Sequence, residues 1–271
     1  MPSPADPCRR IVAATTRRTE RIVEALDGLD SDSLCAPSEL PGWSRLTIAC
    51  HLRFGAAALL RMTAAGLSGE ETAYYPEGRM VQRPCTLVAE PGEHPHTVVR
   101  SLARLGGELD RLWRSIDDGA WNVELREPED NPDLGTVPLS GLALLRLTEV
   151  EVHGSDLNVG LDDWSDSFVG AALPTRLGRL GVRRTNHRQF DDTLNGSWLL
   201  VAVDGPTYKV SVYGRTVESH PADPSSSATA VIEATSRDLL ALLLGRSLQH
   251  PLRIGGNLEF GRAFSAAFPG P

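Results

Sequence analysis

Positive charge is scarce in this 271-residue sequence. Its 27 basic residues include a single lysine, Lys209, and 35 acidic residues outnumber them, which leaves a formal net charge of -8 and a pI near 5.4. A molecule with this charge is repelled at long range by nucleic acids and by anionic membrane surfaces. The composition therefore argues against a nucleic-acid or membrane partner and favours a small molecule.

Long apolar runs and paired cysteines are also missing. No run approaches the roughly 20 apolar residues that span a bilayer, and the first ten residues lack the apolar segment of a secretion signal. The four cysteines show no Cys-x-x-Cys spacing, so neither a disulfide framework nor a cysteine zinc ribbon is indicated. Gly-x-Gly-x-x-Gly, Walker and Gly-x-Ser-x-Gly elements do not occur. We expect a cytoplasmic protein. Nucleotide binding and serine hydrolysis have no support from the sequence.

Helical periodicity is what the first 160 residues do contain. Ser44 is a suitable N-cap for a helix that carries Ile48 and Leu52. The stretch 70–95 is punctuated by proline and glycine and is predicted to be a long loop. Apolar residues recur at the 3.6-residue period in four segments: 11–26, 48–60, 98–116 and 139–157. The pattern predicts a four-helix bundle with a long crossover connection.

The pattern changes after about residue 190. Segments 197–203 and 208–213 are rich in Val, Leu and Tyr and flank Asp204-Gly205-Pro206, which predicts a β-hairpin. A third strand at 228–233 and a helix at 237–244 should follow. We therefore expect a mixed α and α+β protein with three parts: a four-helix bundle over 1–165, a linker helix over 166–189, and a smaller C-terminal α+β domain over 190–271.

Two predicted helices carry side chains that suit a metal ion. Glu149 and His153 are four residues apart and share one helix face, about 5 to 6 Å between Cβ atoms, while His51 precedes Gly55 by one turn on the second helix. Two imidazoles and one carboxylate suit a divalent metal, and the same set of ligands is found in non-haem iron enzymes. The spacing also allows a hydrogen-bonded Glu149/His153 pair and an ordinary core histidine at position 51.

Several segments around these residues match patterns of a known family. They are Pro41-Gly42-Trp43-Ser44 ahead of His51, the stretch 69–79, RLTEVEVHGSDL at 146–157, and ATSRDLLALLLGR at 234–246. Together they resemble the mycothiol-dependent maleylpyruvate isomerase family, part of the DinB-like group of metal-dependent bundles. The resemblance implies a DinB-like N-terminal bundle, zinc bound by His51, Glu149 and His153, and substrate binding by Arg79 and Arg246. Either arginine could equally form a surface ion pair.

The resemblance also implies a chemistry. Three protein ligands leave a fourth position open on zinc, and a thiol that enters it, here mycothiol, is deprotonated. Asp156 could orient a ligand from behind or cap the helix end. The sequence departs from the family at Leu144, where a tryptophan is common, and over 80–85 and 93–96, which should border the mouth of the site.

Because of these departures, we expect transfer or exchange of mycothiol on a larger electrophilic or S-conjugated substrate, as in lincosamide-type antibiotic pathways. The alternative is maleylpyruvate cis-trans isomerisation. Further alternatives are a non-haem iron enzyme and a non-catalytic module that senses a thiol or a metal.

Overall fold

The computed structural model describes residues 5–181 and 194–270. It divides the chain into two compact units, residues 1–168 and 169–271, and each is considered by itself. The first part of the predicted linker helix corresponds to α7 (Asp166–Gly178), whereas its last part, residues 182–189, lies outside the described residues. The predicted domain boundaries at 165 and 190 stay a prediction.

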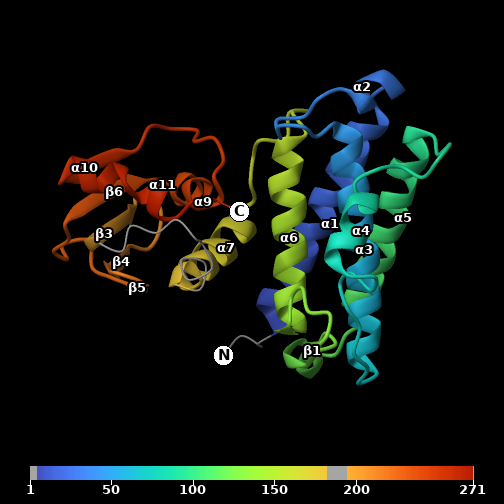
Figure 1. The fold of residues 1–271 in the computed structure, drawn as a ribbon, viewed down its shortest axis with the longest axis horizontal. Coiled ribbons are helices and arrows are strands. Elements are labelled where there is room, and N and C mark those ends of the chain that lie inside the picture. Colours follow the sequence, from blue (N-terminus) through green and yellow to red (C-terminus); the bar gives the residue numbers. More distant parts are fainter. Residues whose placement is uncertain (1–4, 182–193, 271) are drawn as a thin grey trace. The chain divides into compact units, whose positions relative to one another are not determined.

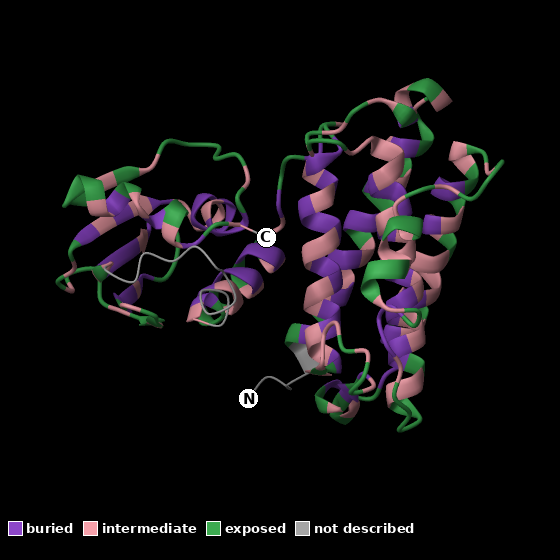
Figure 2. Cartoon of the chain, viewed as in Figure 1, coloured by how far each residue is buried: buried purple, intermediate pink, exposed green. Residues whose placement is uncertain are grey.

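Four long helices build the first unit (Figure 1). They are α1 (Ala5–Asp27), α3 (Arg45–Leu67), α5 (Pro95–Arg114) and α6 (Leu139–Asp156). Helices α1 and α3 each pack against both α5 and α6, and their buried faces point inward (Figure 2). Leu59, Trp113 and Leu142 are among the fully buried residues of the core, and each large apolar side chain removed from water contributes roughly 1.5 to 3 kcal/mol. The predicted four-helix bundle is confirmed.

Local signals explain where the bundle helices begin. The Ser44 hydroxyl accepts a hydrogen bond from the Thr47 amide, so the predicted N-cap of α3 is present. Pro95 opens α5, where its missing N–H costs nothing. The predicted loop over 70–95 is partly wrong, because it contains α4 (Arg79–Thr86). Helix α4 has no buried residue, so no apolar periodicity signals it, and Gly78 starts it with a φ of 83° that favours glycine.

Short elements that were not predicted complete the first unit. They are α2 (Ser31–Cys35), the 3-10 helix η1 (Asp118–Asn122), β1 (Glu124–Arg126) and β2 (Thr136–Pro138). Strands β1 and β2 pair antiparallel between α5 and α6. Leu125 of β1 is buried so close to Gly66 of α3 that a Cβ at Gly66 would overlap its side chain. A side chain at position 66 would therefore force the Leu125 side chain to move.

A five-stranded sheet forms the centre of the second unit. Its order is β5-β4-β3-β6-β7, with β3 parallel to β6 and all other pairs antiparallel. The strands are β3 (Asn195–Ala202), β4 (Tyr208–Tyr213), β5 (Thr216–Pro221), β6 (Ala230–Ala234) and β7 (Arg253–Gly256); the helices after β6 are α9 (Ser236–Leu244), α10 (Leu258–Arg262) and α11 (Phe264–Ala267). The hairpin, third strand and helix are confirmed, whereas β5 and β7 were missed.

The core of the second unit centres on Trp198 of β3. Its ring is fully buried, stacks on Phe260 with centroids 4.2 Å apart, and meets Phe264 and Phe268 edge-on. The indole N–H donates to the Phe260 carbonyl at 2.8 Å, which satisfies its buried donor. The smaller α+β fold expected for this part is confirmed. Among the described helices of both units, none combines the length and apolarity needed to cross a membrane.

Candidate metal centre

The three side chains singled out from the sequence meet between α3 and α6. Glu149 Oε2 lies 2.7 Å from His51 Nε2 and 3.5 Å from His153 Nε2. One donor atom from each of the three residues lies within 4.8 Å of the others, and no other such group occurs among the described residues. Helix α6 supplies two of them because Glu149 and His153 are one turn apart, and packing of α3 on α6 adds His51. Their role as metal ligands stays a prediction at this point.

Asp156 holds the second ring nitrogen of His153. Its Oδ2 lies 2.9 Å from His153 Nδ1, and the residue is buried. A carboxylate can only accept, so Nδ1–H donates, and in the neutral ring Nε2 carries the free lone pair that points to the centre. No such partner supports His51, whose Nδ1 is buried without a hydrogen bond to any described residue.

Burial and mutual contact set the charges of the centre in the absence of metal. Burial lowers the pKa of His51 below its ordinary value, and this outweighs the effect of Glu149. Burial alone would lower the pKa of His153, but hydrogen bonds with Asp156 and Glu149 outweigh it and raise the pKa to about 9. Burial would raise the pKa of Glu149, yet the two histidines hold it well below its usual range. The metal-free centre at neutral pH therefore contains an ionised Glu149, a neutral His51 and a protonated His153.

Trp43 and Arg83 border the centre, and sequence reasoning assigned a role to neither. The Trp43 ring stacks on His153 with centroids 5.9 Å apart and meets His51 edge-on at 5.5 Å. Arg83 of α4 places its guanidinium carbon 5.9 Å from the centroid of Trp43, and its charge contributes to the lowered pKa of His51. It forms no ion pair with any described residue. The guanidinium is therefore available beside the centre to an anion.

Comparison with known proteins identifies the family of this chain. Residues 13–158 match the family described as mycothiol maleylpyruvate isomerase N-terminal domain, which is more than half of the chain. The chain belongs to this family. Membership confirms the family resemblance drawn from the sequence and, with it, the prediction of an enzyme. No curated protein matches the chain.

Solved structures with the same fold extend the match over both units. The crystal structure of the mycothiol-dependent maleylpyruvate isomerase superposes with a TM-score of 0.67 and 19% identity, and the match covers 94% of this chain and 96% of that one. A histidine-to-alanine mutant of such an enzyme gives a TM-score of 0.63 and 20% identity, covering 91% and 93%. At this identity the likeness establishes the shared fold.

The two arginines expected to bind substrate have different surroundings in this family member. Arg79, at the start of α4, forms an ion pair with Asp133 through Nη1 at 2.8 and 3.1 Å and lies over the Tyr75 ring at 5.6 Å. Arg246 belongs to the second unit, where its Nη1 donates to the Leu244 carbonyl at 3.3 Å just after α9. Within the described part of the first unit, the ion pair of Arg79 is with Asp133 and not with a residue of the triad. The substrate role of both arginines stays a prediction.

A buried carboxylate anchors the segment that leads into α4. Glu127 accepts hydrogen bonds from the amide of Tyr74 at 2.6 Å and from three consecutive amides at 133–135, at 2.5 to 2.7 Å. These bonds tie the segment before α4 to the loop between β1 and β2, which also supplies Asp133 to Arg79. Glu127 was not singled out from the sequence, because its partners are backbone amides of a loop that shows no motif.

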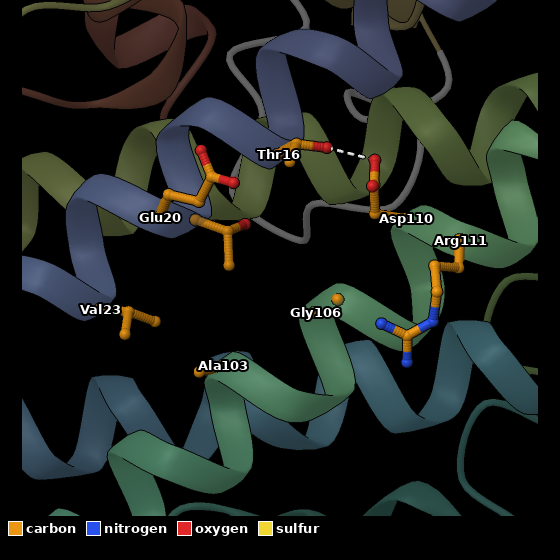
Figure 3. A pocket seen from close by; sticks show the side chains of 9 residues that line it. Thr16, Glu20, Val23, Ala103, Gly106, Asp110 and Arg111 are labelled. Carbon is orange, nitrogen blue, oxygen red and sulfur yellow. Dashed lines mark hydrogen bonds between the residues drawn. The ribbon is translucent and has the colours of Figure 1, made fainter.

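Two of the cavities in the described part of the bundle lie between its helices. One of about 410 Å³ opens between α3, α4 and α5, and its lining includes Cys50, Phe54, Gln82 and Cys85. Burial raises the pKa of Cys50 to about 11, so this neighbour of His51 stays a thiol, as expected for a core cysteine. The other, of about 220 Å³, lies between α1 and α5 and is bordered by the Thr16–Asp110 hydrogen bond (Figure 3). Only the first includes residues of α3 next to the triad.

Proposed function

We propose that this protein is a metal-dependent enzyme that uses mycothiol to convert a conjugated keto acid of the maleylpyruvate type from the cis to the trans form. The observation that carries the proposal is the convergence of His51, Glu149 and His153 on one point beside Arg83. Family membership supports the thiol and the reaction class. The remaining support comes from how the side chains suit the metal ion, the thiol and the substrate.

The donor set fits a divalent ion such as zinc. With zinc–ligand distances of about 2.0 to 2.2 Å, neighbouring donors around a tetrahedral ion lie roughly 3.4 Å apart. The separations of 2.7 and 3.5 Å between Glu149 Oε2 and the two Nε2 atoms lie on either side of this value. Glu149 is ionised, and Asp156 leaves His153 with its lone pair on Nε2 once the ring is neutral. Iron remains the alternative, because two histidines and one carboxylate also suit that metal.

Each side chain has a distinct part in the proposed reaction. A metal held by three ligands would lower the pKa of a thiol at its open position, so that the thiol reacts as thiolate. Asp156 fixes the orientation of the His153 ring, and Trp43 covers the flat face of that ring. Arg83 offers fork-like hydrogen bonds to a carboxylate of the substrate. A conjugated dicarboxylate suits this combination of thiolate and cation.

Isomerisation now has more support than the thiol transfer that the sequence favoured. That preference rested on the departure of residues 80–85 and 93–96 from the family pattern. In the structure, part of this stretch is α4, which brings the cation of Arg83 to the centre and so suits an anionic substrate. The matched family is also described as an isomerase. Transfer to an electrophile in secondary metabolism therefore becomes the second candidate.

One experiment separates these candidates. Metal content is measured on protein purified without added metal, and the product of mycothiol with maleylpyruvate is identified by mass spectrometry beside a panel of electrophiles and S-conjugates. We expect about one zinc per chain, a trans product of unchanged mass, and loss of both metal and turnover in His153→Ala. Glu108→Gln, on an exposed ion pair of α5, is the matched control. Stable mycothiol adducts would instead indicate transfer, and iron with oxygen-dependent turnover would contradict the thiolate chemistry.

A non-catalytic sensing module is tested by the same samples. If no substrate is turned over while the zinc-loaded protein binds mycothiol, the proposed reaction is wrong and the sensing alternative gains support. Turnover that persists in His153→Ala would contradict the assignment of the metal centre.

A further inference from the structure

A second layer of polar groups lies one helical turn away from the triad. Gly55 follows His51 by one turn on α3, and Arg146 precedes Glu149 by one turn on α6. A Cβ placed on Gly55 would lie 3.1 Å from the Tyr74 hydroxyl and 3.4 Å from Arg146 Nη1. The hydroxyl and the guanidinium therefore approach the same spot on α3, where the absence of a side chain leaves room for them.

The Tyr74 hydroxyl is held in place but has no hydrogen-bond partner among the described residues. The ring is packed edge-on against Phe54 at 5.6 Å and Tyr75 at 5.0 Å, and the Tyr74 amide donates to Glu127. Only 7% of the residue is exposed. Its position is therefore fixed from the ring and from the backbone, while its O–H remains free to donate.

Arg146 supplies a buried positive charge behind this hydroxyl. The residue is 1% exposed; Nη1 donates to the Leu52 carbonyl at 2.8 Å, and Nη2 is buried without a partner among the described residues. Burial lowers the pKa of Arg146 to about 10, so it stays charged at neutral pH. Burial raises the pKa of Tyr74, so the phenol keeps its proton. A hydroxyl with a cation behind it in a dry site is a strong donor to an oxyanion.

We propose that the Tyr74 hydroxyl, with Arg146 behind it, donates a hydrogen bond to the carbonyl oxygen of the substrate while negative charge develops there. The inference rests on the proposed isomerase function. Addition of the thiolate forms a C–S bond, breaks the π bond of the conjugated alkene, and moves that electron pair onto the carbonyl oxygen. After rotation about the resulting single bond, the pair returns, the alkene re-forms in the trans geometry, and the thiolate leaves with its electrons. Tyr74 keeps its proton throughout.

Tyr74→Phe tests this role, because it removes only the hydroxyl. With mycothiol and maleylpyruvate on the zinc-loaded enzyme, we expect kcat to fall about 10² to 10³-fold, the usual loss for one oxyanion donor, while KM stays within about twofold. Tyr75→Phe is the matched control in the same segment and should keep kcat. Gly55→Ala should also lower kcat, because its new methyl group would lie against the Tyr74 hydroxyl.

The outcomes separate this inference from the proposed function. If wild-type protein isomerises maleylpyruvate and Tyr74→Phe keeps its kcat, the donor role is wrong and the isomerase proposal stands. A rise in KM without a change in kcat would also overturn it, since the hydroxyl would then bind the ground state. Loss of zinc from Tyr74→Phe would point to a structural role and overturn the inference as well. If wild-type protein itself shows no isomerisation, the proposed function fails first.

Discussion

Proton competition at His153 should control metal binding, and Asp156→Asn tests this. Hydrogen bonds with Asp156 and Glu149 raise the pKa of His153 to about 9, so the proton must leave before Nε2 can bind a metal ion. With this pKa, competition weakens the apparent affinity at pH 7 about 100-fold relative to the fully deprotonated ring. Affinity for zinc should therefore rise about tenfold for each pH unit up to about pH 9 and then level off.

Replacing Asp156 by Asn has two opposing effects. The pKa of His153 should fall toward its ordinary value of 6.5, which nearly removes proton competition at pH 7. Loss of the carboxylate behind the ring also weakens a metal ligand, typically by about 10 to 100-fold. The two effects largely cancel at pH 7, whereas near pH 9.5 only the weakening remains. Wild type should then bind about 10 to 100-fold more tightly than the variant.

Chelator competition across this pH range measures both effects. Glu108→Gln is the control, because its exposed ion pair with Arg104 lies on α5 outside the centre. Parallel pH profiles for wild type and Asp156→Asn would refute the reasoning, as would a wild-type affinity that does not change between pH 7 and pH 9.

Three further predictions concern the site and its support. Arg83→Gln should raise KM for maleylpyruvate about tenfold or more, because a charge-assisted contact is lost. Arg79→Gln should raise KM less, because Arg79 pairs with Asp133. A larger rise in KM for Arg79→Gln would contradict the role of Arg83. Glu127→Gln should lower the free energy of unfolding in urea by about 1 to 3 kcal/mol, since the substitution weakens hydrogen bonds to four amides. Glu124→Gln, at an exposed position, should change the free energy of unfolding little. Equal effects of the two variants would contradict the role of Glu127. Because the folded-state pKa of His153 lies above 6.5, its stabilisation is present below pH 6.5 and is lost toward pH 9. The Tm of chelated protein should fall over that interval, and a constant Tm would contradict the shift.

Local patterns account for what could be predicted. The four bundle helices each bury one face, so their apolar residues repeat every 3.6 positions and are visible in the sequence. Glu149 and His153 needed only the geometry of one helix, and the Ser44 cap only the three residues after it. The first hairpin of the sheet was visible because β3 and β4 are apolar and flank a short turn.

The elements that were missed lack such patterns. Helix α4 buries no residue, and β5 and β7 are mostly exposed edge strands of the sheet, so none shows a clear apolar period. Arg83 lies 40 positions from Trp43 in the chain, and only folding brings α4 over that ring. Arg79 was chosen instead because it matched the family pattern, whereas its pairing with Asp133 depends on the loop between β1 and β2.

By itself, the sequence determined the bundle, the sheet hairpin and the three candidate ligands, because each follows from spacing along one helix or strand or from family residues. Only the tertiary structure decided which groups surround those ligands. Arg83 beside Trp43, and Tyr74 with Arg146 at Gly55, depend on how side chains from separate elements pack. For Asp156, which shares α6 with His153, the structure decided between orienting a ligand and capping the helix end. Their charges and hydrogen bonds change with burial, and burial is a property of the folded chain.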